Sequence, residues 1–308
     1  MTAASSRSSW SERFAAQAPT GPACPRGVFL VSPQGLSISA ESALDNAYMD
    51  AASGADSARA LQQHAALHAA LSRAGVPTIC FAGRAETPDA VFPNNVFATA
   101  RDASGARLII GSMRHPVRRL EAERADIVDC FRAVLGYAVC DLRDKPGISE
   151  LTGTLVIDRA RRIGLAGLSS RCDRDGVASM RDAFGLAEAF EFPLHASEYH
   201  TNVVLSVLAS RALVLAPGGL ADAADAAALA DLYAGAVIEL DAAEHAAFAG
   251  NCIAVRPDQV WMSERAADAL RPSSRAAFER LGFDVHAVAL DAIEAAGGSL
   301  RCCVGELY

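Results

Sequence analysis

The residues best suited to covalent chemistry in this chain are the thiol of Cys302 and the imidazole of His200. Cys302 follows Gly297-Gly298, and glycines before a cysteine permit a tight turn and a close approach of substrate. The thiolate is the working form of a cysteine nucleophile, and it needs a nearby base or cation. We therefore predict that Cys302 attacks the substrate and that His200 carries the proton. The alternative interpretation is a buried structural thiol and a histidine satisfied within the core.

Two neighbours of this pair also matter for the prediction. Glu150 is the carboxylate expected to orient the imidazole of His200 and to stabilise its cation, and a solvated loop charge is the alternative for it. Cys303 is the weaker nucleophile candidate, because successive residues of a strand point to opposite faces.

Other polar residues are candidates for holding a substrate. Asp89 could bind an amino group or cap a turn. Arg118 and Arg171 could clamp a carboxylate, which the planar guanidinium fork matches, and a solvated position is the alternative for each. The amides of Asn95 and Asn202 could orient a planar group by hydrogen bonds.

A repeat of strand, strand, helix and strand must position these residues. Four copies follow one another along the chain, and the two ends of the chain together supply a fifth. We predict strands at 28–31, 77–81, 96–99, 108–111, 137–142, 154–157, 163–168, 203–207, 213–216, 237–240, 252–255, 260–262, 285–290 and 302–307, and helices at 57–73, 117–135, 176–190, 222–234 and 264–281.

The period of this repeat predicts where the polar residues meet. Asn95, Asn202, Asn251 and Cys302 each open a strand, at spacings of about 50 residues or about twice that, the sign of a propeller or array. Glu150 lies just before the remaining strand. Joining the first and last strands removes exposed sheet edges. We therefore predict an α/β fold, a five-bladed pseudo-symmetric α/β propeller, with these residues converging on its central axis.

Composition narrows the function classes. The chain has 308 residues, 51% of them apolar, and a formal net charge of −8, so it lacks the basic surface of a nucleic-acid-binding protein. No apolar run is long enough to span a membrane. None of the eight cysteines forms a C-x-x-C pair, so we expect a reducing compartment, the cytoplasm, with neither a disulfide framework nor a zinc site.

The chain divides into two parts. Residues 1–26 are rich in Ser and Ala, and we expect a disordered tail there, with an organelle-targeting segment as the alternative. Residues 27–308 are expected to form a single catalytic propeller domain.

These motifs together resemble the guanidino-group-modifying superfamily, also called penteins, which includes arginine deiminases, dimethylarginine dimethylaminohydrolases and glycine amidinotransferases. The resemblance runs from about residue 27 to Tyr308. The citrulline-utilisation hydrolase branch is the most similar. The segments that carry the resemblance are Pro88-Asp89-Ala90-Val91-Phe92-Pro93-Asn94-Asn95, Glu150-x-Thr152-Gly153, 167–171, 199–203, 248–253, 262–265, Ile293-Glu294 followed by Gly297-Gly298, and Cys302-Cys303.

The resemblance implies a role for each candidate. Cys302 would be the nucleophile, His200 the acid and base and Glu150 its partner, with no metal and no cofactor. The substrate contacts would be Asp89, Asn94, Asn95, Arg118 and Arg171. Asn202 and Asn251, at the axial position, are added to the substrate-binding set. The implied ligand is a small arginine-like amino acid, and a homodimer is among the expected assemblies.

Two departures from the family pattern bear on the substrate. Arginine deiminases carry aspartates where this chain has Asn95 and Asn202, and the amides remove two negative charges that would hold a guanidinium. We therefore expect citrulline, hydrolysed to ornithine, ammonia and carbon dioxide. Leu151 stands where the citrulline branch usually has Gly, so the turn after Glu150 should differ. The alternatives are hydrolysis of arginine or dimethylarginine, amidino transfer to an amine, and a propeller that binds an amino acid or a partner without catalysis.

Overall fold

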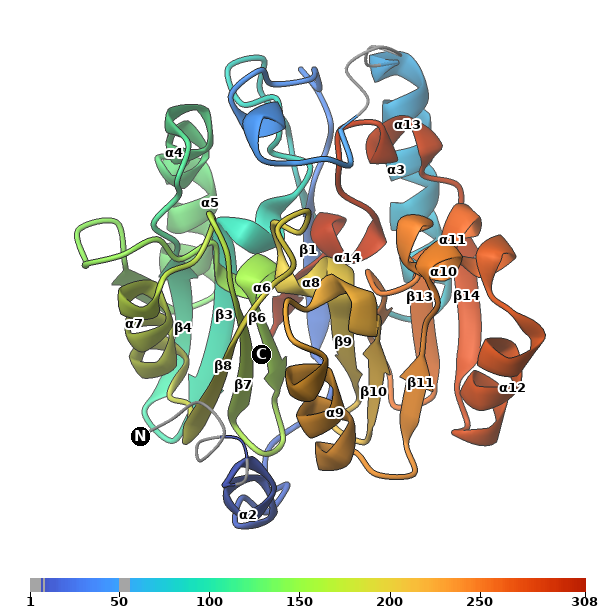
Figure 1. Ribbon diagram of the computed structural model, residues 1–308. Helices are drawn as coiled ribbons and strands as arrows, with labels where there is room; N and C mark the ends of the chain where they lie inside the picture. Colours follow the sequence, from blue (N-terminus) through green and yellow to red (C-terminus); the bar gives the residue numbers. More distant parts are fainter. Residues whose placement is uncertain (1–6, 8, 50–55) are drawn as a thin grey trace.

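Five three-stranded sheets surround one central axis in the computed structural model, which describes residues 7, 9–49 and 56–308 (Figure 1). In each sheet the first pair of strands is antiparallel and the second pair is parallel, with a helical segment joining the parallel strands. This is the α/β propeller expected from the repeat. The fold-class prediction is confirmed.

The strands fall into the five sheets in sequence order, except that the last strand joins the first sheet. They are β1 (Gly27–Val31), β2 (Thr78–Phe81), β3 (Phe97–Asp102), β4 (Gly105–Ile110), β5 (Ala138–Asp141), β6 (Leu155–Asp158), β7 (Ile163–Leu168), β8 (Glu188–Pro193), β9 (Leu205–Leu208), β10 (Ala212–Leu215), β11 (Val237–Glu239), β12 (Ile253–Ala254), β13 (Gln259–Ser263), β14 (Asp284–Val288) and β15 (Gly305–Leu307).

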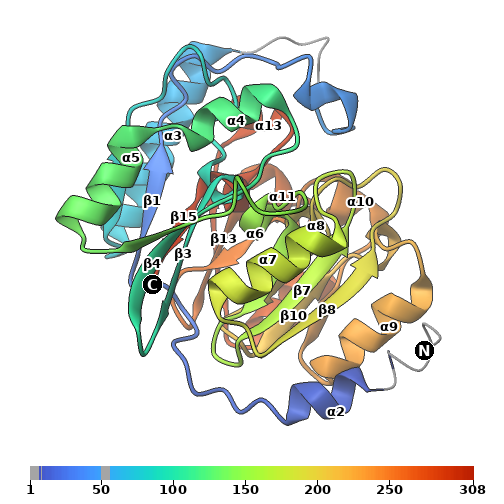
Figure 2. The ribbon, with the colours of Figure 1, turned by 90° about the vertical axis from the view of Figure 1, so that its left-hand side faces the viewer.

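Most of the longer helices cover the outside of the ring, and shorter turns lie near its axis (Figures 1 and 2). The helical segments are α2 (Trp10–Ala15), η1 (Ser42–Leu44), α3 (Ser57–Arg73), η2 (Pro93–Asn95), α4 (Pro116–Ala122), α5 (Ala125–Asp129), η3 (Cys130–Val134), α6 (Leu151–Thr154), α7 (Arg174–Phe184), α8 (Thr201–Val204), η4 (Pro217–Gly219), α9 (Ala223–Leu232), α10 (Ala242–Ala246), α11 (Glu264–Ala269), α12 (Pro272–Arg280), α13 (Asp291–Glu294) and α14 (Leu300–Cys303).

The two ends of the described ring close on each other. Strand β15 pairs antiparallel with β1, so that Gly27 lies opposite Leu307 and Phe29 opposite Gly305. A Cβ at Gly305 would clash with the Phe29 ring, so glycine is favoured at this crossing. The predicted sharing of one blade between the chain ends is therefore present, and it leaves β1 paired on both sides.

The main departure from the sequence prediction concerns the axial residues. Asn95, Asn202 and Cys302 were expected to open strands, but they and Glu150 lie on or just before single helical turns that precede the strands: η2, α6, α8 and α14. Asn251, by contrast, lies two residues before β12. Each turn is too short to show helical periodicity in the sequence. A one-turn helix before a strand still places its residues near the axis. The predicted convergence therefore does not require these residues to lie in the strands.

Three predicted helices are wrong in extent. The helix expected at 176–190 ends at Phe184, because Gly185 adopts a left-handed cap with φ of 65°, and residues 188–193 form β8 instead. The helix expected at 264–281 is split at Pro272, which begins α12 because proline cannot continue a helix from within. The helix expected at 117–135 is divided into α4, α5 and a π-helical turn.

The expected disordered tail also differs from the structure. Residues 1–6 and 8 lie outside the described residues, but Trp10–Ala15 form helix α2, which packs beside α9 (Figure 2). Trp10 stacks on Phe190 with ring centroids 5.0 Å apart, and Phe14 packs against Tyr233. The apolar face of this short helix is buried, which a reading of overall Ser and Ala content does not reveal.

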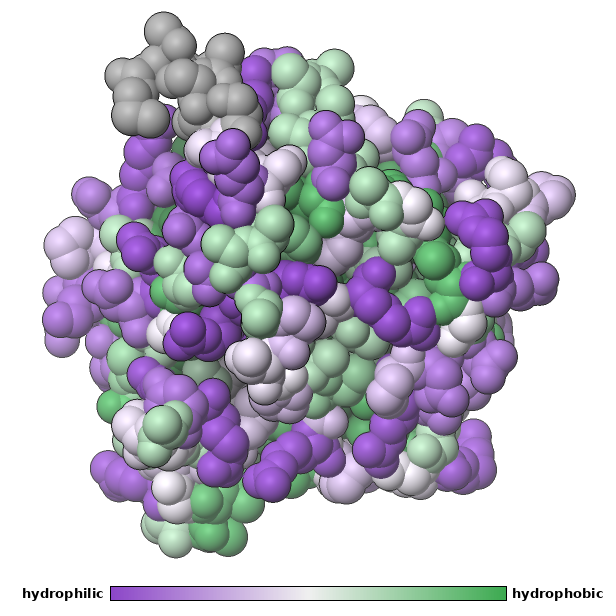
Figure 3. Space-filling model, turned by 90° about the horizontal axis from the view of Figure 1, so that it is seen from below, coloured by the Kyte–Doolittle hydropathy of each residue, from purple (hydrophilic) through white to green (hydrophobic). Residues whose placement is uncertain are grey.

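Opposite the loops at the top of Figure 1, the lower surface of the molecule mixes hydrophilic and hydrophobic residues, with hydrophilic ones spread across the whole view (Figure 3). Within the residues that the structure describes, no helix is both long and apolar enough to cross a membrane.

Candidate active site

The axial turns η2, α6, α8 and α14 meet at the centre of the ring (Figure 1). Cys302, on α14, is buried, and its sulfur lies 3.2 Å from Nδ2 of Asn251 and 3.8 Å from Nδ2 of Asn202. The backbone N–H of Cys302 donates to the carbonyl of Ser299, which precedes the turn. Two amides from two other blades therefore hold the sulfur in place.

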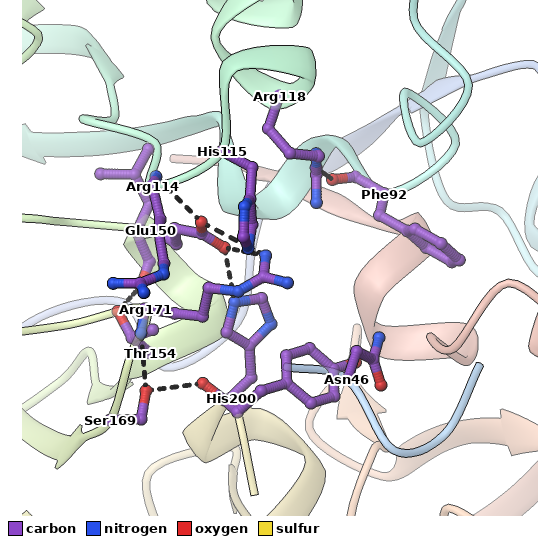
Figure 4. A network of polar contacts seen from close by, with 12 residues as sticks. Asn46, Phe92, Arg114, His115, Arg118, Glu150, Thr154, Ser169, Arg171 and His200 are labelled. Carbon is purple, nitrogen blue, oxygen red and sulfur yellow. Dashed lines mark hydrogen bonds and ion pairs between the residues drawn. The ribbon is translucent and has the colours of Figure 1, made fainter. Parts of the chain in front are cut away.

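His200 and Glu150 form a second buried group, at the starts of α8 and α6. Nε2 of His200 lies 2.8 Å from Oε2 of Glu150, and both side chains are almost completely shielded from solvent. Glu150 also accepts a hydrogen bond from Nη1 of Arg171 at 3.2 Å, so one carboxylate is shared by the imidazole and the guanidinium (Figure 4). The backbone N–H of Arg114 donates to its other oxygen.

The charges in this region follow from burial and pairing. Burial raises the pKa of the Cys302 thiol, with a smaller opposing effect from the hydrogen bond of Asn251. Burial lowers the pKa of His200, and Glu150 only partly opposes this effect. The pKa of Glu150 is lowered: burial would raise it, but the Arg171 charge and the contacts with His200 together outweigh burial. A neutral thiol, a neutral imidazole and a carboxylate therefore occupy the unliganded site near neutral pH.

One cavity connects Cys302 with most of the predicted substrate residues. Asp89, Asn95, Arg118 and Arg171 line it together with Cys302, and the other lining residues are Ser42, Asn46, Met49, Phe92, Tyr199, Ala296, Gly297 and Gly298. Asn202 and Asn251 reach the site through their contacts with the sulfur. Asn94 is fully buried in the same turn as Asn95.

Several buried polar atoms around this cavity lack partners among the described residues. They are Oδ1 of Asp89, both side-chain amide atoms of Asn94, Oδ1 of Asn95 and Nδ1 of His200. A buried polar group without a partner costs free energy, so a cluster of such groups is the mark of a site that a ligand completes.

Glycines allow the close approach of these groups. A Cβ at Gly153 would lie 2.5 Å from Oδ1 of Asn95 and 2.9 Å from the His200 ring, so Gly153 lets both side chains meet over the turn. Gly297 has φ of 84°, and a Cβ at Gly298 would lie 2.8 Å from the Phe92 ring. The tight turn expected before Cys302 is thus present.

The two arginines expected to clamp a carboxylate are already paired. Arg118 donates to both carboxylate oxygens of Glu121 and to the carbonyl of Phe92. Burial raises the pKa of Glu121 to about 7, against the effect of Arg118. Arg171 donates to Glu150 and to Asp45. Each guanidinium is therefore already paired with a carboxylate, which sequence spacing could not reveal.

The structure also shows residues of the site that sequence reasoning missed. Asp45 and Ser42 come from the segment between β1 and α3, which carries no repeat signal. Arg114 lies shortly after β4, as Arg171 lies shortly after β7, so its position within the repeat could have identified it. Tyr199 packs on His200 with ring centroids 4.4 Å apart.

Leu151 has a strained backbone. Its φ is 29°, a conformation that glycine adopts far more easily, and its side chain is completely buried. The turn after Glu150 therefore has the glycine-like conformation despite the leucine, and burial of the side chain holds it there.

No group of three or more His, Cys, Asp or Glu side chains in the described ranges is arranged to hold a metal ion.

The fold and the family match define the class of the protein. It is a five-bladed α/β propeller of the guanidino-group-modifying superfamily, a hydrolase that acts on guanidino C–N bonds with a cysteine nucleophile. The model of a family described as "N,N dimethylarginine dimethylhydrolase, eukaryotic" matches residues 32–308. The chain belongs to this family.

Solved structures with the same fold include three informative ones. The N-terminal domain of ArgZ, an arginine dihydrolase from the ornithine-ammonia cycle in Cyanobacteria, has a TM-score of 0.76 at 18% identity, over 91% of this chain and 97% of that one. A mutant of AgrE with L-arginine has a TM-score of 0.77 at 20% identity, over 91% of this chain and 40% of that one.

A mutant dimethylarginine dimethylaminohydrolase, in an adduct with S-methyl-L-thiocitrulline, has a TM-score of 0.69 at 21% identity, over 92% of this chain and 100% of that one. At these identities the likeness concerns the fold. No curated protein sequence matches the chain.

Proposed function

We propose that this protein hydrolyses the guanidino group of arginine or of an N-methylated arginine, with Cys302 as nucleophile. The observation that carries the proposal is a set of unpartnered buried atoms: Oδ1 of Asp89 and Oδ1 of Asn95, from residues that line the cavity with Cys302, and Nδ1 of His200. A guanidinium offers several N–H donors in one plane, and the two oxygens are acceptors for them. The ligands in the neighbouring structures, L-arginine and S-methyl-L-thiocitrulline, belong to the same chemical class.

Charge favours a cationic substrate at this sulfur. Burial keeps the Cys302 thiol neutral near pH 7, since its pKa lies above the ordinary value. A bound guanidinium would bring a positive charge into the cavity and stabilise the thiolate, while Asp89 offers a carboxylate oxygen to the cation. The substrate would therefore help to activate its own nucleophile.

The reaction we propose has two steps. The Cys302 thiol gives its proton to His200, and the thiolate adds to the guanidino carbon. The bond to one nitrogen then breaks, and the amine leaves with the proton that His200 carries. The resulting amidino thioether is attacked by a water molecule that gives its proton to His200, the C–S bond breaks, and the ureido product leaves. From arginine and one water molecule the products are citrulline and ammonia, and from a methylated arginine they are citrulline and the methylamine.

A specific observation favours a second candidate, the hydrolysis of citrulline. The amides of Asn95 and Asn202 bring no negative charge to the cavity, which suits a neutral ureido group. The family match and the fold neighbours lend more support to the guanidino substrates. If the two amides determine the preference for citrulline over arginine, the double variant Asn95→Asp and Asn202→Asp should raise the ratio of kcat/KM for arginine to kcat/KM for citrulline. An unchanged ratio would remove the ureido candidate's support.

A product assay tests the proposal directly. The purified protein is incubated separately with arginine, dimethylarginine and citrulline, and citrulline, ornithine, ammonia and methylamines are measured, with Cys302→Ser as the control. We expect citrulline from arginine or dimethylarginine, and none from the control. Ornithine from citrulline would support the second candidate, an amidino group transferred to an added amine would indicate a transferase, and binding without turnover would indicate a binding protein.

A further inference from the structure

The carboxylate of Asp45 occupies a site built to hold a carboxylate. Nε of Arg171 lies 2.9 and 3.0 Å from its two oxygens, and the hydroxyl of Ser170 donates to Oδ2 at 2.8 Å. Nε2 of His115 lies 3.1 Å from Oδ1, and Nε of Arg114 lies 3.4 Å from Oδ2. Four side chains therefore converge on one carboxylate.

The donors belong to the ring, whereas the carboxylate belongs to a separate loop. Arg114 and His115 lie between β4 and α4, and Ser170 and Arg171 lie between β7 and α7. Asp45 comes from the segment that joins β1 to α3. This segment also supplies Ser42, Asn46 and Met49 to the wall of the cavity that contains Cys302. The ring thus builds a carboxylate site, and a loop that also lines the cavity fills it.

Asp45 balances the charge of this site. Arg171 is buried, and its remaining N–H groups donate to Glu150 at 3.2 Å and to the carbonyl of Ser42 at 3.1 Å. With Asp45 in place, the guanidinium groups of Arg114 and Arg171 face the carboxylates of Asp45 and Glu150. Among these four groups the positive and negative charges balance, so none of their positive charge is left over for the carboxylate of a ligand. Without Asp45, the site would carry one uncompensated positive charge.

We propose that Asp45 competes with the carboxylate of an amino-acid substrate for Arg171 and Arg114, and is therefore a specificity-determining residue. The inference rests on the proposed function, because it requires a guanidino group to bind at Cys302. Arg171 and Cys302 line the same cavity, so one ligand can reach both.

The competition has opposite consequences for two kinds of ligand. An arginine-like ligand with an α-carboxylate binds these arginines only when Asp45 leaves them. A ligand without that carboxylate, such as the decarboxylated amine agmatine, leaves Asp45 where it is and gains from its negative charge. Asp45→Asn should therefore strengthen the binding of ligands that carry an α-carboxylate. It should weaken, or leave unchanged, the binding of ligands without one.

The test compares two alkylating reagents on the full chain, so that it does not depend on turnover. One is chloroacetamidine, which has no carboxylate, and the other is the chloroacetamidine derivative of ornithine, which has one. The readout is the second-order rate of labelling at Cys302, followed by mass spectrometry. We expect Asp45→Asn to raise the ratio of the ornithine reagent's rate to the simple reagent's rate by at least about tenfold, the size of one charge-assisted hydrogen bond.

Two further variants keep the test sharp. Leu44→Ser changes a neighbouring side chain that is 80% exposed, and it should leave the ratio unchanged. Asp45→Ser should raise the ratio as Asp45→Asn does, so the test can still be made if one of these two variants is unstable. A ratio that stays constant in both Asp45 variants would overturn the inference.

Failure of the proposed function and failure of the role of Asp45 give different results. If neither arginine nor dimethylarginine is hydrolysed but the ratio rises, the proposed function fails and the role of Asp45 stands. If hydrolysis occurs and the ratio does not change, only the role of Asp45 fails. If neither reagent labels Cys302, both proposals are contradicted.

Discussion

The imidazole of His200 and the carboxylate of Glu150 come from different blades of the ring and are joined by a buried hydrogen bond of 2.8 Å. Each residue directly precedes a one-turn helix, α8 or α6 respectively. The pair leaves Nδ1 of His200 without a partner among the residues described. The carboxylate thus fixes the ring through one nitrogen and leaves the other nitrogen for proton transfer.

Glu150→Gln should lower kcat on the order of 100-fold or more, the usual range for losing general acid-base assistance. Glutamine keeps the shape of the side chain but removes the negative charge that stabilises an imidazolium, and it leaves Arg171 without this counter-charge. Steady-state kinetics on folded protein, checked by circular dichroism, measures the effect. Glu264→Gln, at an exposed helix start, is the matched control. A kcat within twofold of the original value would show that Glu150 does not assist proton transfer by His200.

The adjacent thiols should respond differently to the same substitution. Both thiols belong to one apolar cluster of the core, but of the two it is Cys302 that contacts Asn251 and lines the cavity. Cys302→Ser should abolish turnover, because a hydroxyl is a far weaker nucleophile at this pH. Cys303→Ser should keep most of the activity and lower the free energy of unfolding by about 1–3 kcal/mol, the cost of a buried hydroxyl without a partner. Loss of turnover in the Cys303 variant alone would show that Cys303, and not Cys302, is the nucleophile.

The pH dependence of alkylation should differ between neutral and cationic reagents. Burial raises the pKa of Cys302 above its ordinary value of 9.0, so the thiolate is scarce at neutral pH and increases as pH rises. Labelling by iodoacetamide should therefore increase with pH and reach half its maximum above pH 9.0. Chloroacetamidine brings a positive charge that stabilises the thiolate, so its midpoint should be lower. An iodoacetamide midpoint near pH 7 would contradict a neutral resting thiol.

A closed ring maps one position of the repeat onto its axis, and for this reason the sequence predicts that Cys302, His200 and Glu150 converge. The structure pairs His200 with Glu150, and Cys302 lines a cavity together with Arg171, which also binds Glu150. Periodicity could not show which groups are already paired. Arg118 and Arg171 have the right residue type for a carboxylate clamp, yet Glu121 and Asp45 already bind them. These pairings depend on side-chain contacts that no spacing encodes.

Local structure was harder to predict wherever one residue decides it. Gly185 ends α7 and allows β8, and Pro272 separates α11 from α12. Glycine and proline are both standard signals for the end of a helix. The apolar pattern continues past them in this sequence, so one unbroken helix was predicted in each place. Asp45 lies in a connection with no period and no motif, so only the structure could place it beside Arg171.

Glu294 should act as a positioning residue for the turn that carries Cys302. Its Oε1 accepts a hydrogen bond of 2.6 Å from the hydroxyl of Ser299, whose carbonyl accepts the N–H of Cys302. Glu294→Gln and Ser299→Ala should each lower kcat by roughly tenfold while changing KM little, because the turn loses one support but the sulfur remains. Steady-state kinetics with both single variants and the double variant measures this.

The double variant separates positioning from independent effects. If the two residues act through one hydrogen bond, the double variant should be no worse than the more damaged single variant. Arg265, whose Nη1 lies 3.9 Å from Oε2 of Glu294, offers a control: Arg265→Gln should have a smaller effect than Glu294→Gln. Effects that multiply in the double variant would show that Glu294 and Ser299 act separately.

Helix α2 should contribute to the stability of the ring without affecting its chemistry. Trp10 is 4% exposed and stacks on Phe190 of β8, and replacing a buried large aromatic side chain by alanine typically costs about 3–5 kcal/mol. Trp10→Ala should therefore lower the unfolding midpoint in urea clearly. Glu12→Ala, on the exposed side of the same helix, should change it little. Because Trp10 does not line the cavity that contains Cys302, kcat of the folded variant should stay unchanged. Equal midpoints for both variants would mean that α2 is not docked in solution, and a lower kcat for Trp10→Ala would mean that the docked helix also supports the site.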